Sequence, residues 1–186
     1  MDLHIKNMVS YRCKLVVKSE LEKLGVPYTN INLGEVEIPE DISREFKDLL
    51  NFNLKKSGLA LIEDKKSILI EKIKNIIIDL VHYSDSKLRI NLSDYLSQKL
   101  NYDYTYLANL FSENQGNTIE HFFLNHKIER VKELLVYDEL NISEIADKLH
   151  YSSVAHLSNQ FKKMTGLTPS DYKHLRVKIR KPIEKV

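Results

Sequence analysis

The sequence predicts an α+β fold in which two small domains are joined by a connecting helix. Three observations support this prediction. Stretches of strand and helix character alternate through residues 1–64. A strongly apolar helical segment follows at 65–86, and two similar helical segments lie fifty residues apart within 87–186. A chain of 186 residues has room for two domains only if both are small.

Residues 1–64 alternate between short extended segments and amphipathic segments. "LHIKNM" has strand character, and "CKLVVKSELEKLG" predicts a helix that ends at Gly25. "VPYTNINL" and "EVEI" flank Gly34 as a hairpin. "EDISREFKDLLNFNLKKSG" is helical in pattern, and "LALIE" is a short closing strand. The order βαββαβ predicts a split βαβ, ferredoxin-like sandwich.

The connecting segment, "KKSILIEKIKNIIIDLVHYS", carries a broad apolar face. Leu69, Ile73, Ile76, Ile77 and Leu80 recur at helical spacing along it. This face is larger than one side of a small domain needs. Two interpretations remain open: a linker helix packed between the domains, or a helix that forms a dimer interface.

The chain repeats itself from Asn91 onward. The segment that begins at Asn91 and the segment that begins at Asn141 agree at one constant offset of fifty positions. The matched pairs are Leu107 and Leu157, Asn109 and Asn159, Phe111 and Phe161, Gly116 and Gly166, and Thr118 and Thr168. So many matches at a single offset indicate a duplicated structural unit.

Each copy has the pattern of a helix, a tight turn and a second helix. Asn101 and His150 occupy the turns, where a residue that tolerates positive φ is needed. Ser152 or Ser153 is suited to cap the helix that follows in the second copy. The pattern predicts a helix-turn-helix, whose second helix enters the major groove of DNA. The alternative is an ordinary helical hairpin.

A long helix is predicted between the two copies. Residues 118–136 show an uninterrupted helical pattern of nineteen residues, which spans about 28 Å. Such a helix could hold the two second helices near one DNA turn, roughly 34 Å, apart. Asn141, followed by Glu144, predicts a capping box at the next helix.

Residues 91 to about 176 resemble the C-terminal DNA-binding region of the AraC/XylS family of bacterial transcription regulators. The resemblance is carried by "ISEIADKL", by "FKKMTGLTPSDYK" and by "YLANLF" followed by a glycine. It implies two helix-turn-helix units per chain, which bind successive major-groove segments of double-stranded DNA. It also implies contacts with RNA polymerase, no enzymatic activity and no cofactor.

The resemblance places a set of DNA-binding residues on the two recognition helices. They are Thr105, Tyr106, Asn109 and Ser112 in the first copy, and Ser153, His156, Asn159 and Lys162 in the second. Many family members have arginine where Asn109 and Asn159 stand. Because asparagine pairs bidentately with adenine, we expect a site rich in A·T pairs. Lys163, Lys173 and Arg176 are expected to contact phosphates, the alternative being plain solvation.

Residues 1–64 are similar to heavy-metal-associated domains. "IKNMVSYRCKLVVKSELEKLGV" and "INLGEVEI" carry the similarity, with Met8 and Cys13 in register with the metal-binding loop. Ser10 stands where the first metal-binding cysteine would be. Since Cu(I) prefers thiolate ligands, a lost metal site is favoured. The alternative is a metal-responsive regulator in which two Cys13 residues share an ion across a dimer.

The charge distribution and composition bear on the binding partner and on the cellular location. Residues 1–64 hold nine Lys or Arg against eleven Asp or Glu, whereas residues 87–186 hold fifteen against twelve. A basic C-terminal part suits a polyanion. The apolar runs are too short to span a membrane. The first ten residues do not have the pattern of a signal peptide, and the single cysteine fits a reducing compartment, so a cytoplasmic location is expected. Residues 1–86 are expected to form a homodimer or to bind a partner. A protein-interaction adaptor that no longer binds DNA is a further alternative.

Overall fold

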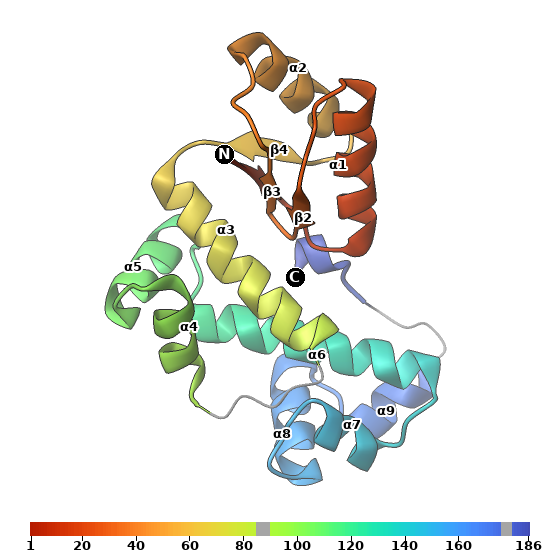
Figure 1. Cartoon of the computed structure of the whole chain (residues 1–186). Coiled ribbons are helices and arrows are strands. Elements are labelled where there is room, and N and C mark those ends of the chain that lie inside the picture. The colour runs from red at the N-terminus through yellow and green to blue at the C-terminus, as the bar shows by residue number, and fades with distance from the viewer. Residues whose placement is uncertain (85–89, 176–179) are drawn as a thin grey trace. The chain divides into compact units, whose positions relative to one another are not determined.

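The computed structural model describes residues 1–84, 90–175 and 180–186. It divides into two compact units, Met1–Ile76 and Ile77–Val186 (Figure 1). The first unit contains β1 (Asp2–Lys6), α1 (Tyr11–Lys23), β2 (Asn30–Asn32), β3 (Glu35–Glu37), α2 (Arg44–Lys55), β4 (Ala60–Ile62) and most of α3 (Lys65–Ile78). The second contains η1 (Asp79–Tyr83), α4 (Leu92–Leu100), α5 (Tyr104–Gln115), α6 (Ile119–Tyr137), α7 (Ile142–Lys148), α8 (Val154–Thr165), α9 (Pro169–His174) and η2 (Ile183–Lys185). Within the described ranges, no helix has the length and apolar character needed to cross a membrane.

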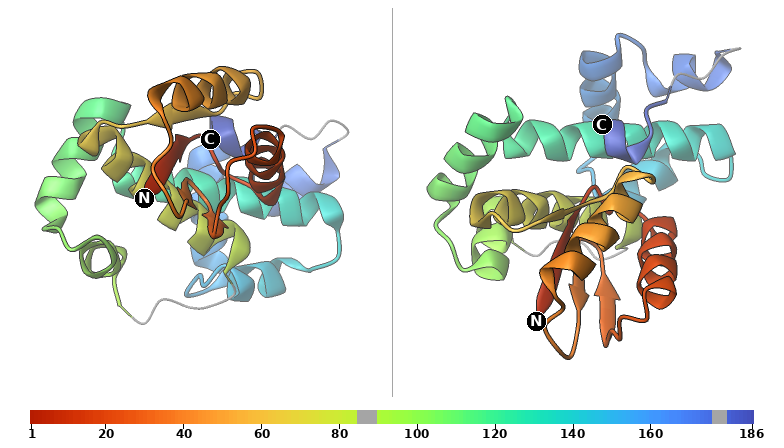
Figure 2. Two further views of the ribbon diagram at one scale, coloured as in Figure 1. Left: turned by 45° about the horizontal axis from the view of Figure 1, so that its top comes forward. Right: turned by 90° about the horizontal axis from the view of Figure 1, so that it is seen from above.

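The first unit is built on a small antiparallel sheet with the strand order β2-β3-β1-β4. Successive side chains on a strand point to opposite faces, so Leu3 and Ile5 share one face. Val36 lies opposite Leu3, and all three side chains are buried. Helices α1 and α2 pack on each other and contribute Leu21 and Leu50 to the same core (Figure 2). The order of these elements is the one that the sequence predicts for residues 1–64.

The hairpin between β2 and β3 depends on a glycine. Gly34 has a φ of 80°, a left-handed conformation that side chains disfavour. The Ile5 amide donates a hydrogen bond to the Gly34 carbonyl at 2.9 Å. The Asn75 amide of α3 donates to the Leu33 carbonyl at 3.2 Å. A Cβ atom on Gly34 would overlap that Asn75 side chain. The turn therefore needs glycine both for its conformation and for the space above it.

In the second unit, α6 contacts α5 near its beginning and α7, α8 and α9 further along (Figure 1). In the first copy, the rings of Phe111 and Phe122 meet edge to face with centroids 5.5 Å apart. In the second copy, Phe161 and Tyr172 meet in the same way at 5.6 Å. These pairs are related by the fifty-residue offset. The duplication predicted from the sequence thus extends to the aromatic packing.

The connecting helix is shorter than expected. We predicted helix over 65–86, but α3 ends at Ile78 and the chain continues as a π-helix from Asp79 to Tyr83. Ser84 is extended, and residues 85–86 lie outside the described part of the chain. The apolar spacing that predicted the helix does not distinguish an α-helical turn from a π-helical one.

Two histidines meet where the π-helix packs on α6. His82 Nε2 lies 3.3 Å from His126 Nδ1, and the two rings are perpendicular with centroids 5.5 Å apart. His126 is fully buried. Burial, with a smaller contribution from Arg130, lowers the pKa of His82 from 6.5 to about 4, although Glu133 opposes the shift. His82 is therefore neutral in the folded chain at pH 7.

Replacing Gly34 by alanine tests the hairpin. A left-handed alanine costs about 1–2 kcal/mol, and displacing Asn75 from Leu33 costs about 1 kcal/mol more. The control is Gly58→Ala, because Gly58 also has a positive φ but nothing lies within 4 Å of its added Cβ. Urea unfolding should show a larger decrease in stability for Gly34→Ala than for Gly58→Ala. Equal decreases would mean that the contact with Asn75 is unimportant.

The histidine contact predicts a pH dependence of stability. Because the pKa of His82 is lower in the folded chain, protons bind the unfolded chain first. The contribution is complete above about pH 6.5 and is lost as the pH falls toward about 4, by roughly 2–3 kcal/mol. Urea unfolding at these pH values should show a weaker pH dependence in His82→Gln. His121→Gln, on an exposed part of α6, is the control. A slope unchanged by His82→Gln would contradict the prediction.

Candidate nucleic-acid interface

Both copies begin their second helix with a side-chain cap. Asp103 precedes α5, and its carboxylate accepts hydrogen bonds from the amides of Thr105 at 2.8 Å and Tyr106 at 3.3 Å. Ser153 precedes α8, and its hydroxyl accepts from the His156 amide at 3.1 Å. The caps satisfy backbone donors that a helix start would otherwise leave open. Each helix is twelve residues long.

The turns have the conformations that the sequence predicts. Asn101 has a φ of 57° and His150 a φ of 56°. Gly116 and Gly166 end α5 and α8 in the left-handed region. Asn141 forms the predicted capping box at α7 with Glu144. The same backbone path is thus built twice from different residues.

The predicted DNA-binding residues lie mostly on one exposed side of each recognition helix. Leu107 and Leu157 are fully buried on the other side. The exposed residues are Thr105, Tyr106 and Asn109 on α5, and His156, Asn159, Lys162 and Lys163 on α8, together with the cap Ser153. Ser112 differs, since it is partly buried and its hydroxyl lies 2.6 Å from the Ala108 carbonyl, to which it donates.

Positive charge is unequally divided between the copies. Residues 91–118 hold one lysine against three acidic residues, whereas residues 141–168 hold three lysines against two. Helix α5 contains no lysine or arginine. Lys162 and Lys163 lie in the last turn of α8. The second copy is therefore the better suited of the two to attract phosphates.

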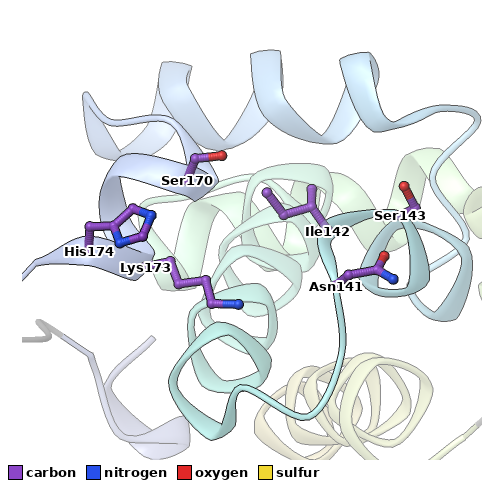
Figure 3. Close-up of a pocket in the computed structure, with 6 residues that line it drawn as sticks. All are labelled: Asn141, Ile142, Ser143, Ser170, Lys173 and His174. Carbon is purple, nitrogen blue, oxygen red and sulfur yellow. The ribbon is translucent and has the colours of Figure 1, made fainter.

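Lys173 lies in α9 beside an open recess. Its ammonium forms an ion pair with Asp138. A cavity of about 400 Å³ is lined by Asn141, Ile142, Ser143, Ser170, Lys173 and His174. Figure 3 shows residues from the start of α7 and from α9 around it. Arg176, the remaining predicted phosphate contact, lies outside the described residues.

Two residues that support the second recognition helix were not predicted from the sequence. Tyr151 follows the turn and is buried in the core of this copy. The Lys127 ammonium of α6 lies 3.8 Å from the centre of the Tyr151 ring, a cation–π contact. Burial lowers the pKa of Lys127 to about 8 and raises the pKa of Tyr151. Helical spacing in the sequence could place Lys127 on α6, but it does not predict the contact with the Tyr151 ring.

The loop that resembles a metal site has one thiol, that of Cys13. Cys13 is the third residue of α1, and its Sγ lies 3.3 Å from the Ser10 hydroxyl. Met8 is fully buried. In the described ranges, no group of three or more His, Cys, Asp or Glu residues could hold a metal ion.

Comparisons with known proteins place the second unit among DNA-binding domains. A helix-turn-helix domain model matches residues 96–174. The chain is 25% identical over 132 residues to the HTH-type transcriptional regulator YtdP of Bacillus subtilis, covering 70% of this chain and 17% of that protein. It is 30% identical over 88 residues to the Msm operon regulatory protein of Streptococcus mutans, covering 47% of this chain and 31% of that protein. The match thus covers less than a third of the length of either relative.

A solved structure agrees with this assignment. The C-terminal domain of AraT, a response regulator from Geobacillus stearothermophilus, is similar with a TM-score of 0.52 and 27% identity. The match covers 61% of this chain and 89% of that domain. The matched part of this chain is thus a helix-turn-helix domain of the kind that transcription regulators use to bind double-stranded DNA.

Proposed function

We propose that this chain, whose second unit is an AraC-like double helix-turn-helix domain, regulates transcription in the cytoplasm by binding a two-part DNA site. Helices α5 and α8 would enter successive segments of the major groove. One observation carries the proposal: the two helices have equal length, matching caps and matching exposed positions, and both copies pack on α6.

Asn109 and Asn159 are the proposed adenine-binding residues. They occupy the same position in the two copies and are exposed in both. An asparagine amide can donate to adenine N7 and accept from the adenine N6 amine, a pairing specific to that base. Thr105, Tyr106, Ser153, His156 and Lys162 would contact the neighbouring base edges or sugars. Ser112 would contribute as an acceptor, because its hydroxyl proton is used within the helix.

Phosphate contacts are proposed for Lys163, Lys173 and Arg176. Lys163 is exposed at the end of α8. Lys173 would exchange its ion pair with Asp138 for a phosphate, and Asp138 is itself exposed. Because the first copy is net acidic, most of the electrostatic attraction would come from the second copy.

We propose that the first unit is a ferredoxin-like domain and that residues 1–86 form a homodimer or dock onto a partner protein. RNA polymerase is a proposed partner of the chain as a whole. Its strand order and antiparallel pairing support this assignment. Residues 1–64 hold two more acidic than basic residues, which would keep this part of the chain away from DNA. Ser10 provides a hydroxyl beside Cys13 in place of a second thiolate, which argues against a Cu(I) site within one chain.

Selection of bound sequences from a random double-stranded DNA pool tests the base assignment. We expect a two-part A·T-rich motif with parts spaced by about one helical turn. Asn109→Ala should lower the preference for adenine in one part by about tenfold, and Asn159→Ala should do so in the other. A motif rich in guanine, or a motif unaltered by both substitutions, would contradict the assignment.

The salt dependence of binding tests the charge asymmetry. Replacing Lys163 by glutamine should reduce the slope of log affinity against log salt by about 0.9, because one phosphate is no longer neutralised. Lys23→Gln is the control, since Lys23 lies in the first unit and is paired with Glu20 at 2.6 Å. Fluorescence anisotropy with a labelled site would give both slopes. An equal slope for wild type and Lys163→Gln would show that Lys163 does not contact a phosphate.

A further inference from the structure

The residue just before the cap of each recognition helix contacts the third residue of that helix. In the first copy, the rings of Tyr102 and Tyr106 are stacked with centroids 5.5 Å apart and planes 23° from parallel. In the second copy, the Ser152 hydroxyl lies 2.9 Å from His156 Nδ1. Tyr102 and Ser152 differ in number by fifty, as do Tyr106 and His156. The same structural position thus holds two different chemical pairs.

The tyrosine stack is exposed rather than part of a core. Tyr102 is 48% exposed and Tyr106 is 44% exposed. Stacked aromatic pairs gain about 0.5–1.5 kcal/mol beyond the area they bury. This energy is enough to favour one orientation of the Tyr106 side chain, but it adds little to the stability of the folded domain. The N-terminal residues of a recognition helix are those that contact base edges. The ring that Tyr102 holds is therefore well placed to meet DNA.

The imidazole of His156 is held from two sides. The Ser152 hydroxyl forms a hydrogen bond with Nδ1 of the imidazole. The Tyr151 ring packs edge to face against the same imidazole, with ring centroids 5.4 Å apart. Tyr151 is buried beneath the Lys127 ammonium, so this second support is itself fixed. The partner of one imidazole nitrogen sets which tautomer is present. The hydrogen bond with Ser152 occupies Nδ1 and leaves Nε2 available to a DNA base. Because the hydrogen bond at Nδ1 fixes the tautomer, Nε2 acts either as a donor or as an acceptor, but not as both.

We propose that Tyr102 and Ser152 are positioning residues for DNA sequence recognition. Each holds the third residue of its recognition helix in one orientation and thereby sets the base preference of its own half of the site. The inference rests on the proposed function. It adds two residues to those that the family resemblance places at the groove.

The two pairs predict two unlike half-sites. The Tyr106 ring, whose orientation is fixed by stacking on Tyr102, suits an apolar contact with the thymine methyl group. His156, held at Nδ1, suits a single hydrogen bond to a base edge. The operator should therefore lack internal symmetry at the positions that these residues face, and each chain should bind in one direction.

Base selection with matched pairs of variants tests the inference. Ser152→Ala removes the hydroxyl, while Ser152→Thr keeps it. Tyr102→Leu removes the stacked ring, while Tyr102→Phe keeps it. We expect Ser152→Ala to lower discrimination in the half-site of α8 by about fivefold and to leave the half-site of α5 unchanged. Tyr102→Leu should do the reverse, and the two conservative variants should match wild type.

The nitrogen chemical shifts of His156 provide a readout that a merely structural role would not move. Ser152→Ala should change the ratio of its two neutral tautomers, and Ser152→Thr should restore it. Retained half-site preferences in both Ser152→Ala and Tyr102→Leu would overturn the inference. So would an equal decrease in both halves accompanied by a lower melting temperature. If wild type selects no motif, the proposed function falls and the inference falls with it.

Discussion

The structure of the second unit depends on α6 being shared by both helix-turn-helix copies. Its first turns close the first copy, where Phe122 meets Phe111 of α5. Its later turns enter the core of the second copy through Val131 and Leu135. Because one rigid helix serves two cores, neither recognition helix can shift along α6 without disrupting close-packed apolar side chains. The separation of the two recognition helices follows from this sharing rather than from any loop.

The functional surface carries little of the stabilising energy. Leu107 and Leu157 face the cores, and Asn109 and Asn159 face solvent on the same helices. The exposed positions are therefore open to changes in base preference at small cost to the fold. The duplication illustrates this, because the cores of the two copies are alike while the exposed residues differ in charge and in chemistry. Such a division would let the proposed interface bind two unlike DNA segments.

The sequence predicted those features that follow from local chemistry. Caps and left-handed turns need particular residues, so Asn101, His150 and the Asn141 capping box could be located in advance. The order of strands and helices in the first unit also follows from periodicity. Features that depend on distant residues could not be predicted. The His82 contact with His126 joins positions forty-four residues apart, and no spacing rule indicates it.

The same limit applies to the interface. Lys173 looked available for phosphate, but its ion pair with Asp138 arises from the path of the chain between α6 and α7. Tyr102 and Ser152 differ in side-chain chemistry, so the repeat gave no reason to compare them. Only the three-dimensional structure shows that each of them contacts the third residue of its recognition helix.

The central claim is that both copies bind one DNA molecule at the same time. Hydroxyl-radical footprinting of the wild-type chain on its selected site tests this claim most directly. The account predicts two protected stretches on one face of the duplex, centred about 10 base pairs apart. A single protected stretch, unchanged by substitutions in α5, would show that the first copy does not contact DNA and would contradict the claim.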